Sequence, residues 1–445
     1  MDNIIPELPH MLQQALEKTP PILLLGVMVL IGAIFGELAR RASLPRITGY
    51  FVAGVLAHLG LVGLDLGWPI HELVRDLMPL FEVALGFVLV EVGRRIQLVW
   101  LVRNKALFGT LVLESVLTFA TVAALFMWLG VGAWSAVLVG AVATSTSPLV
   151  LHALIMQVRA EGQISDRALH IAAVNTMVAA VLVSALLPIA NSAQPHLQIV
   201  YVLKPLAGLV LAAVIGTLSG RLLRVLLVRS RDLPYAWVCV IGAVSLMVGL
   251  AQWGGAPVVV SALAMGLSVS DAAQRRAATR KGMQPLQLPE PPALSVLMYV
   301  VLFLFAGAAL PWRQWWVQPI DWPFVAALAV ALLLARLGAK ALGTFAMGSW
   351  SGLRPSQSVG LALALQPMTV TGLALYLQVR AGFPGLEPQA GTALLVALAV
   401  ADLLMPLLVM RVLRSSGEAE ALPPRAASKF APRAAEPAAA RLREL

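Results

Sequence analysis

Two apolar stretches of the chain are each interrupted near the middle by a proline with polar neighbours. The first carries Thr144, Ser145, Thr146 and Ser147 directly before Pro148. Proline removes a backbone N–H and blocks the carbonyl four residues earlier, so a helix breaks or kinks there. Such a break at bilayer depth is tolerated only where it lines a protein-walled or watery cavity. The hydroxyls and freed peptide groups can satisfy one another or offer oxygen ligands to an ion.

The second interruption places Gln366 before Pro367, with Thr369 shortly after. The two breaks lie seven apolar segments apart, so they are expected to enter the membrane from opposite sides. Interrupted helices at corresponding positions of two halves predict an inverted-repeat transporter with its site between the breaks. Ser and Thr also serve in helix packing, so kinks that bind nothing are the alternative reading.

Ionisable residues inside the same apolar stretches are candidate functional groups by default. Arg336 lies midway along its segment, and Lys340 follows one turn later on the same helical face. Arg336 either binds a solute or neutralises helix C-terminal dipoles at the breaks. Lys340 either takes a direct part or extends its ammonium group toward the membrane surface.

Two carboxyl groups, Glu114 and Asp402, occupy positions well inside their segments. Each is a candidate proton carrier, or else the structural partner of a nearby hydroxyl or cation. Asn175 and Thr176 lie near mid-depth of an otherwise apolar segment, which predicts that this segment faces the cavity.

The composition indicates a polytopic membrane protein. Of the 445 residues, 59% are hydrophobic and only 12% are charged, whereas about 25% are charged in a soluble domain. We predict an all-α fold of about 13 transmembrane helices, two of them interrupted and crossing. The apolar segments span about residues 22–40, 47–64, 76–93, 105–129, 134–157, 168–190, 200–228, 235–252, 256–270, 293–311, 322–347, 356–380 and 390–413.

The net charge of +10 is explained by loop charges rather than by nucleic-acid binding. Basic residues in alternate loops number 18 on one side and 5 on the other. The positive-inside rule then puts the N-terminus outside and the C-terminus in the cytoplasm, in a bacterial-type plasma membrane. We expect an outer segment over 1–21, a transporter domain over 22–413 and a disordered tail over 414–445. The single cysteine, Cys239, has no partners for a disulfide or a metal site, and we expect no enzyme activity, metal or cofactor.

Five stretches occur along the chain in a characteristic order: "LPRITGYFVAGVLAHLGLVG", "LFEVALGFVLVEVGRRI", "ATSTSPLVLHALI", "SALAMGLSVSD" and "RLGAKALG". Together they resemble the monovalent cation:proton antiporter family, in the branch that includes bacterial potassium-efflux antiporters. The resemblance covers about residues 22–413. It implies a core bundle moving against a scaffold, exchange of Na⁺ or K⁺ for protons by alternating access, and a homodimer.

The resemblance also implies an aspartate on the sixth segment that binds the cation and the proton in turn. The matching position is Met177 or the Asn175–Thr176 pair, and none of these is a carboxylate. A glutamate that often follows the second break is replaced by Thr369. Three functions therefore stay open: an antiporter in which Glu114 or Asp402 has taken over, a transporter of another solute such as a small anion held by Arg336, and a non-transporting sensor or assembly partner.

Overall fold

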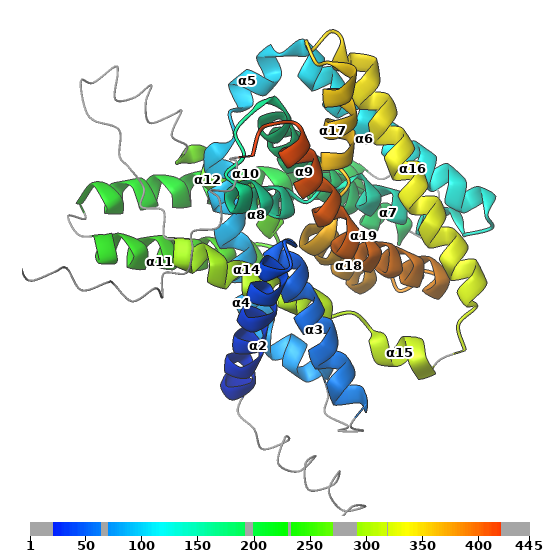
Figure 1. Cartoon of the computed structure of the whole chain (residues 1–445), viewed down its shortest axis with the longest axis horizontal. Coiled ribbons are helices and arrows are strands. Elements are labelled where there is room, and N and C mark those ends of the chain that lie inside the picture. The colour runs from blue at the N-terminus through cyan, green and yellow to red at the C-terminus, as the bar shows by residue number, and fades with distance from the viewer. Residues whose placement is uncertain are drawn as a thin grey trace, which may run out of the picture.

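The first half of the chain forms a series of helices around one interruption. A computed structural model describes residues 21–63, 70–191, 199–229, 233–269, 292–317 and 319–419, and every regular element in these ranges is a helix (Figure 1). In chain order, the first helices are α2 (Pro21–Arg41), α3 (Arg46–Gly63), α4 (Ile70–Arg95), α5 (Leu98–Arg103), α6 (Lys105–Trp128), α7 (Ala133–Thr144), α8 (Pro148–Val158) and α9 (Gln163–Ala190).

The second half repeats the pattern, with its own interruption near the end. Its helices are α10 (Ile199–Arg229), α11 (Leu233–Trp253), α12 (Val258–Ser268), α14 (Pro292–Ala308), α15 (Trp312–Val317), α16 (Trp322–Gly348), α17 (Pro355–Ala364), α18 (Thr369–Gly382) and α19 (Pro388–Ser415). Each apolar segment expected from the sequence coincides with one of these helices or with an interrupted pair.

Seven of the described helices, counting the interrupted α7–α8 as one, are long and apolar enough to cross a membrane. The number becomes eight if the bent pair α17–α18, with its axes 47° apart, forms one span. The count of about 13 therefore stays a prediction. The six-residue helices α5 and α15 were not expected from hydropathy, and the predicted terminal segments 1–21 and 414–445 lie almost wholly outside the described residues.

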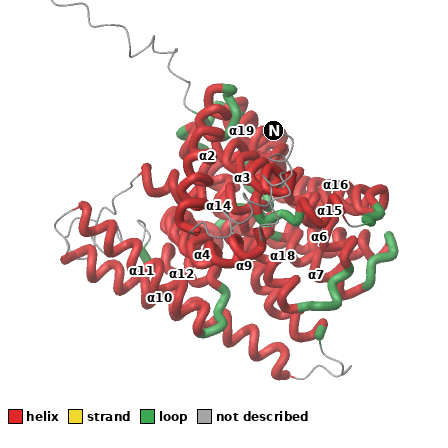
Figure 2. Tube along the Cα trace, turned by 90° about the horizontal axis from the view of Figure 1, so that it is seen from below, coloured by secondary structure: helices red, strands yellow, loops and turns green. Residues whose placement is uncertain are grey.

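The helices form two groups that lie side by side in both ribbon views (Figures 1 and 2). We call the first the scaffold group; its members pack on one another and are α2, α3, α4, α10, α11, α12 and α14. We call the second the break group; it holds both interruptions and consists of α6, α7, α8, α9, α16, α17, α18 and α19. Contacts between the groups join α9 to α10 and α12, α8 to α4, α19 to α3 and α18 to α14.

Close helix packing in the scaffold group depends on two glycines where α3 meets α14. A Cβ atom on Gly54 would lie 2.0 Å from the Leu304 carbonyl oxygen, and one on Gly307 would lie 2.2 Å from the Phe51 carbonyl oxygen. No side chain fits at either place, so the two backbones touch. Small residues at such interfaces are typical of helix association in membranes.

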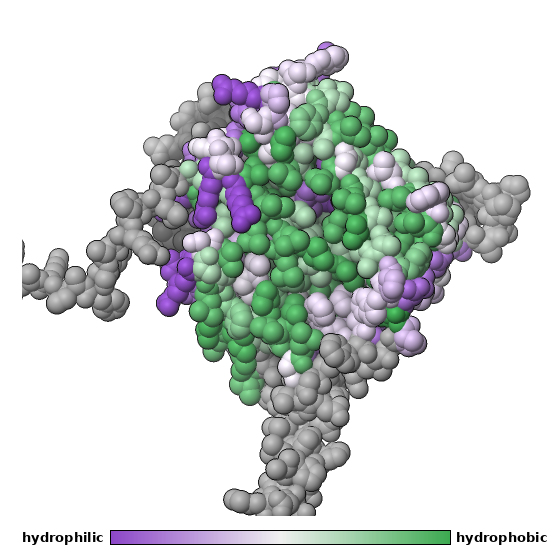
Figure 3. Space-filling model, turned by 45° about the vertical axis from the view of Figure 1, so that its right-hand side comes forward, coloured by the Kyte–Doolittle hydropathy of each residue, from purple (hydrophilic) through white to green (hydrophobic). Residues whose placement is uncertain are grey.

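The outer surface of the break group is apolar. Large hydrophobic side chains of α6 and α16 are exposed, including Val116 at 57%, Leu334 at 62% and Leu342 at 62%. Figure 3 shows a broad hydrophobic surface with hydrophilic residues concentrated near its margins. An apolar area of this extent is expected for a surface that faces lipid.

Candidate functional site

The two helix interruptions contact each other directly. The α7–α8 break spans residues 145–147, and Pro148 occupies the first turn of α8, where its missing N–H costs nothing. The Ser147 N–H donates to the Pro367 carbonyl at 2.7 Å, and the Thr146 hydroxyl donates to the Leu365 carbonyl at 3.1 Å. Peptide groups freed by one break are thus paired with those freed by the other.

The guanidinium of Arg336 on α16 joins the two breaks. Its Nη1 donates to the Ser145 carbonyl and its Nη2 to the Gln366 carbonyl, each at 3.0 Å. These carbonyls lie at the C-terminal ends of α7 and α17, where the helix dipole concentrates negative charge. The side chain is fully buried. This arrangement matches the reading in which Arg336 neutralises the two helix ends.

An ion pair lies beside the crossing. The Lys340 ammonium, one turn after Arg336, lies 2.7 Å from Glu114 Oε2 and donates to the Thr146 hydroxyl at 3.0 Å. Both charged side chains have no exposed surface. Lys340 therefore turns inward, to a carboxylate on a helix more than 200 residues earlier in the chain, and does not extend toward the membrane surface.

Amide and hydroxyl groups of α6 and α9 complete the coordination of Glu114. Asn175 Nδ2 donates to Glu114 Oε1 and, at 3.2 Å, to the Thr146 hydroxyl. Ser115 donates to Asn175 Oδ1 at 3.0 Å, and Thr176 donates to the Thr146 carbonyl at 2.7 Å. We call Glu114, Lys340, Asn175, Thr146 and Ser115 the Glu114 cluster. Ser115 was not singled out in the sequence, although it directly follows Glu114.

A glycine allows α6 and α16 to approach closely enough for the ion pair. A Cβ atom on Gly343 would lie 2.5 Å from Glu114 Cβ and 2.9 Å from its backbone N and Cα. The position on α16 that faces the Glu114 backbone therefore holds no side chain. This contact fixes the distance from which Lys340 reaches Glu114.

The remaining predicted site residues divide into two kinds. Some hydroxyls and amides bond within their own helix, as Thr144 does to Gly140, Ser145 to Val142 and Gln366 to Ala362. By contrast, the hydroxyls of Ser147 and Thr369 are buried and have no hydrogen-bond partner among the described residues. These two hydroxyl oxygens beside the breaks therefore remain candidate ligands.

Asp402 on α19 is buried, and its Oδ1 has no hydrogen-bond partner in the described part of the chain. It shares no hydrogen bond with the Glu114 cluster. Of the two carboxyl groups expected as proton carriers, only Glu114 lies in a network with both breaks. No cluster of three or more metal-ligating side chains occurs among the described residues.

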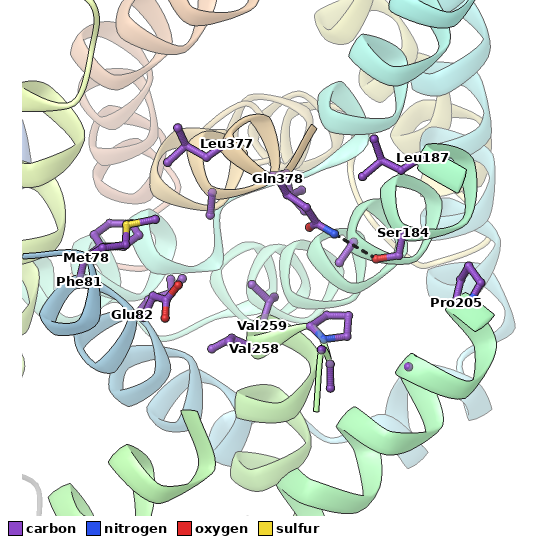
Figure 4. Close-up of a pocket in the computed structure, with 18 of the residues that line it drawn as sticks. Met78, Phe81, Glu82, Ser184, Leu187, Pro205, Val258, Val259, Leu377 and Gln378 are labelled. Atoms are coloured by element: carbon purple, nitrogen blue, oxygen red, sulfur yellow. Dashed lines mark hydrogen bonds between the residues drawn. The ribbon is translucent and has the colours of Figure 1, made fainter. Parts of the chain in front are cut away.

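Two pockets lie between the helix groups at opposite ends of α4. The pocket at the Glu82 end has a volume of about 540 Å³ and is lined by α4, α9, α10, α12 and α18 (Figure 4). Its wall includes Ala180 and Leu375, each one helical turn beyond the buried Thr176 and Thr371. The pocket therefore ends about one turn from the crossing.

The pocket at the other end of α4 has a volume of about 370 Å³ and contains His152 and Glu91. His152 lies one turn after Pro148, so this pocket also ends close to the break. The His152 ring contacts the Tyr299 hydroxyl at 2.6 Å, and its Nε2 lies 3.9 Å from Glu91 Oε1. The crossing of the two breaks is thus flanked by a pocket on each side.

The family model for the transmembrane domain of sodium/hydrogen exchangers matches residues 26–414. The chain belongs to the sodium/hydrogen exchanger family. Its membership confirms the antiporter resemblance, whereas the potassium-efflux branch stays a prediction. No match was found among curated proteins.

Solved structures of the sodium proton antiporter MjNhaP1 from Methanocaldococcus jannaschii have the same fold as this exchanger-family chain. A structure at pH 8 gives a TM-score of 0.63 at 17% identity, covering 89% of this chain and 96% of the other. A structure from electron microscopy gives a TM-score of 0.66 at 18% identity, covering 91% and 99%. The exchanger fold therefore extends over nearly the whole described chain.

Proposed function

We propose that this protein exchanges a monovalent cation, Na⁺ or K⁺, for a proton, with the Glu114–Lys340 pair as the exchange site. The observation that carries the proposal is a fully buried ion pair hydrogen-bonded to Thr146 at the crossing of two interrupted helices. Family membership supports cation:proton antiport as the type of activity. The solved antiporter of the same fold is described as a sodium proton antiporter.

The pair can alternate between a protonated form and a cation-bound form, which is the role that the missing segment-6 aspartate would otherwise have. When Lys340 releases one proton to water, Glu114 is left as an unpaired buried carboxylate, which is costly in a low-dielectric site. A monovalent cation beside Glu114 restores the balance of charge. The Thr146 and Ser115 hydroxyls and Asn175 Oδ1 offer further oxygen atoms, which hard cations prefer. One cation is thus exchanged for one proton.

The two flanking pockets support alternating access to this site. The loop-charge pattern assigns the Glu82 end of α4 to the outer side and the Glu91 end to the cytoplasm. Both pockets lie between the scaffold and break groups, so displacement of one group against the other would enlarge one pocket at the expense of the other. The helices α6, α7, α8 and α9 contact one another in the same pairs as α16, α17, α18 and α19 do. This correspondence supports the predicted inverted repeat.

The anion alternative gains no support from Arg336, because both of its terminal nitrogens already donate to backbone carbonyls and its side chain is fully buried. Assembly as a homodimer in a bacterial plasma membrane stays part of the proposal. Chemical cross-linking in native membranes and cysteine labelling of the loops would check the dimer and the orientation.

Proton flux in proteoliposomes tests the function. With a pH-sensitive dye inside and an imposed proton gradient, addition of Na⁺ or K⁺ should dissipate the gradient, and addition of choline should not. Glu114→Gln should abolish this flux. Glu37→Gln is the matched control, because Glu37 is a carboxylate on the surface of α2 that pairs with Arg40 and Arg41. Wild-type vesicles without any cation-dependent flux would refute antiport and favour the non-transporting alternative.

A further inference from the structure

A carboxylate outside the Glu114 cluster lies on the wall of the larger pocket. Glu82 comes from α4, and Figure 4 shows its carboxylate directed into the pocket beside Phe81 and Met78. Its Oε2 is buried and has no hydrogen-bond partner among the described residues. No Lys, Arg or His is among the described residues that line this pocket. An acidic group held in such a wall is stabilised by a bound cation.

The wall opposite Glu82 presents oxygen atoms. Gln378 of α18 donates its amide N–H to the hydroxyl of Ser184 on α9 at 3.4 Å. This bond directs the amide nitrogen toward α9, and Figure 4 shows the amide oxygen on the side that faces Glu82. The remaining lining is mostly aliphatic or aromatic, so these three side chains are the principal polar groups of the pocket.

The position of the pocket connects it with the exchange site. Ser184 and Gln378 lie two helical turns beyond Asn175–Thr176 and Thr371, on the two helices that carry those residues toward the crossing. A solute that enters between the helix groups from the Glu82 end of α4 meets this pocket before it reaches the crossing.

We propose that Glu82, with the oxygens of Gln378 and Ser184 across the pocket, forms a second binding site for a partly hydrated monovalent cation. This inference rests on the proposed cation transport. The site holds the cation at the pocket before its transfer to Glu114, and the remaining water ligands fill the space that the three side chains leave. Loss of the carboxylate removes the main attraction, which predicts about a tenfold weaker cation binding at the pocket, equivalent to about 1.4 kcal/mol.

Binding can be measured without transport. Purified full-length protein in detergent is heated in NaCl or KCl, with choline chloride at equal ionic strength as the reference. The Glu114→Gln variant should still be stabilised by Na⁺ or K⁺, and the Glu82→Gln/Glu114→Gln double variant should lose that stabilisation. Equal stabilisation of both variants would overturn the proposal.

Flux assays then separate a cation site from a proton carrier. Glu82→Gln should raise the outside cation concentration for half-maximal flux about tenfold while the maximal rate is kept, and Glu82→Asp should restore most of the affinity. Asp76→Asn is the matched control, since it removes an exposed carboxylate from the same end of α4 outside the pocket. An equal effect of Asp76→Asn, or a lost maximal rate with unchanged cation affinity, would refute the site. If the wild type shows no flux, the proposed function fails, whereas the heating experiment still decides on Glu82.

Discussion

The buried Glu114–Lys340 pair makes a quantitative prediction about stability. Both side chains have no exposed surface and their charged atoms lie 2.7 Å apart. Removal of either charge leaves the other buried without its partner, which typically costs about 3–5 kcal/mol. Glu114→Gln and Lys340→Met should each lower the free energy of unfolding by that amount. The glutamine side chain keeps an amide oxygen that can accept from Asn175, so the main loss is the charge.

The double variant distinguishes an ion pair from two independent contributions. Because the substituted amide and thioether side chains are both neutral and leave no unpaired charge, Glu114→Gln/Lys340→Met should cost only about 0–2 kcal/mol relative to wild type. The measurement is reversible unfolding in mixed micelles during SDS titration, arranged as a double-mutant cycle. Additivity of the two single effects within about 0.5 kcal/mol would refute the coupling. The same double variant should show no cation-dependent flux although it is folded, which separates the transport role from stability.

Three further predictions follow from the geometry. Gly343→Ala should destabilise the protein by about 1–3 kcal/mol, because the added Cβ would meet the Glu114 backbone. Gly338→Ala on the same helix is the control: an added Cβ there has no atom within 4 Å, so this variant should be neutral or stabilising in the same SDS titration. Arg336→Met should destabilise more than Arg336→Lys, since each carbonyl left without a donor costs about 1–3 kcal/mol; equal thermal stability of the two variants would contradict this. Asp402→Asn should keep cation-dependent proton flux in proteoliposomes, because no hydrogen bond joins Asp402 to the Glu114 cluster, and loss of flux would reopen its role as a proton carrier.

Hydropathy located the helices well because a helix in lipid must satisfy its backbone within its own sequence. The expected segment at 105–129 is the helix Lys105–Trp128, and the one at 322–347 is Trp322–Gly348. The breaks were also predictable, since Pro148 and Pro367 act locally. The short helices α5 and α15 were missed because six residues are too few for a hydropathy signal.

The site could be predicted as a set of residues but not as a set of pairs. Glu114, Lys340, Asn175 and Thr146 were all candidates because polar groups at bilayer depth are costly. Lys340 reaches Glu114 because α16 is rotated toward α6 in a particular way and because Gly343 has no side chain. Neither property can be read from one helix alone, so the outward-turned alternative for Lys340 could not be decided from the sequence.

The position of Arg336 has a consequence for how the protein can move. Its guanidinium is anchored at once to the Ser145 carbonyl of the first interrupted helix and to the Gln366 carbonyl of the second. If one interrupted helix moved while the other stayed in place, the buried guanidinium would lose one of these two hydrogen bonds. The two interrupted helices and α16 should therefore move together as one rigid unit. The proposed alternating access then needs flexibility only where that unit slides along neighbouring helices.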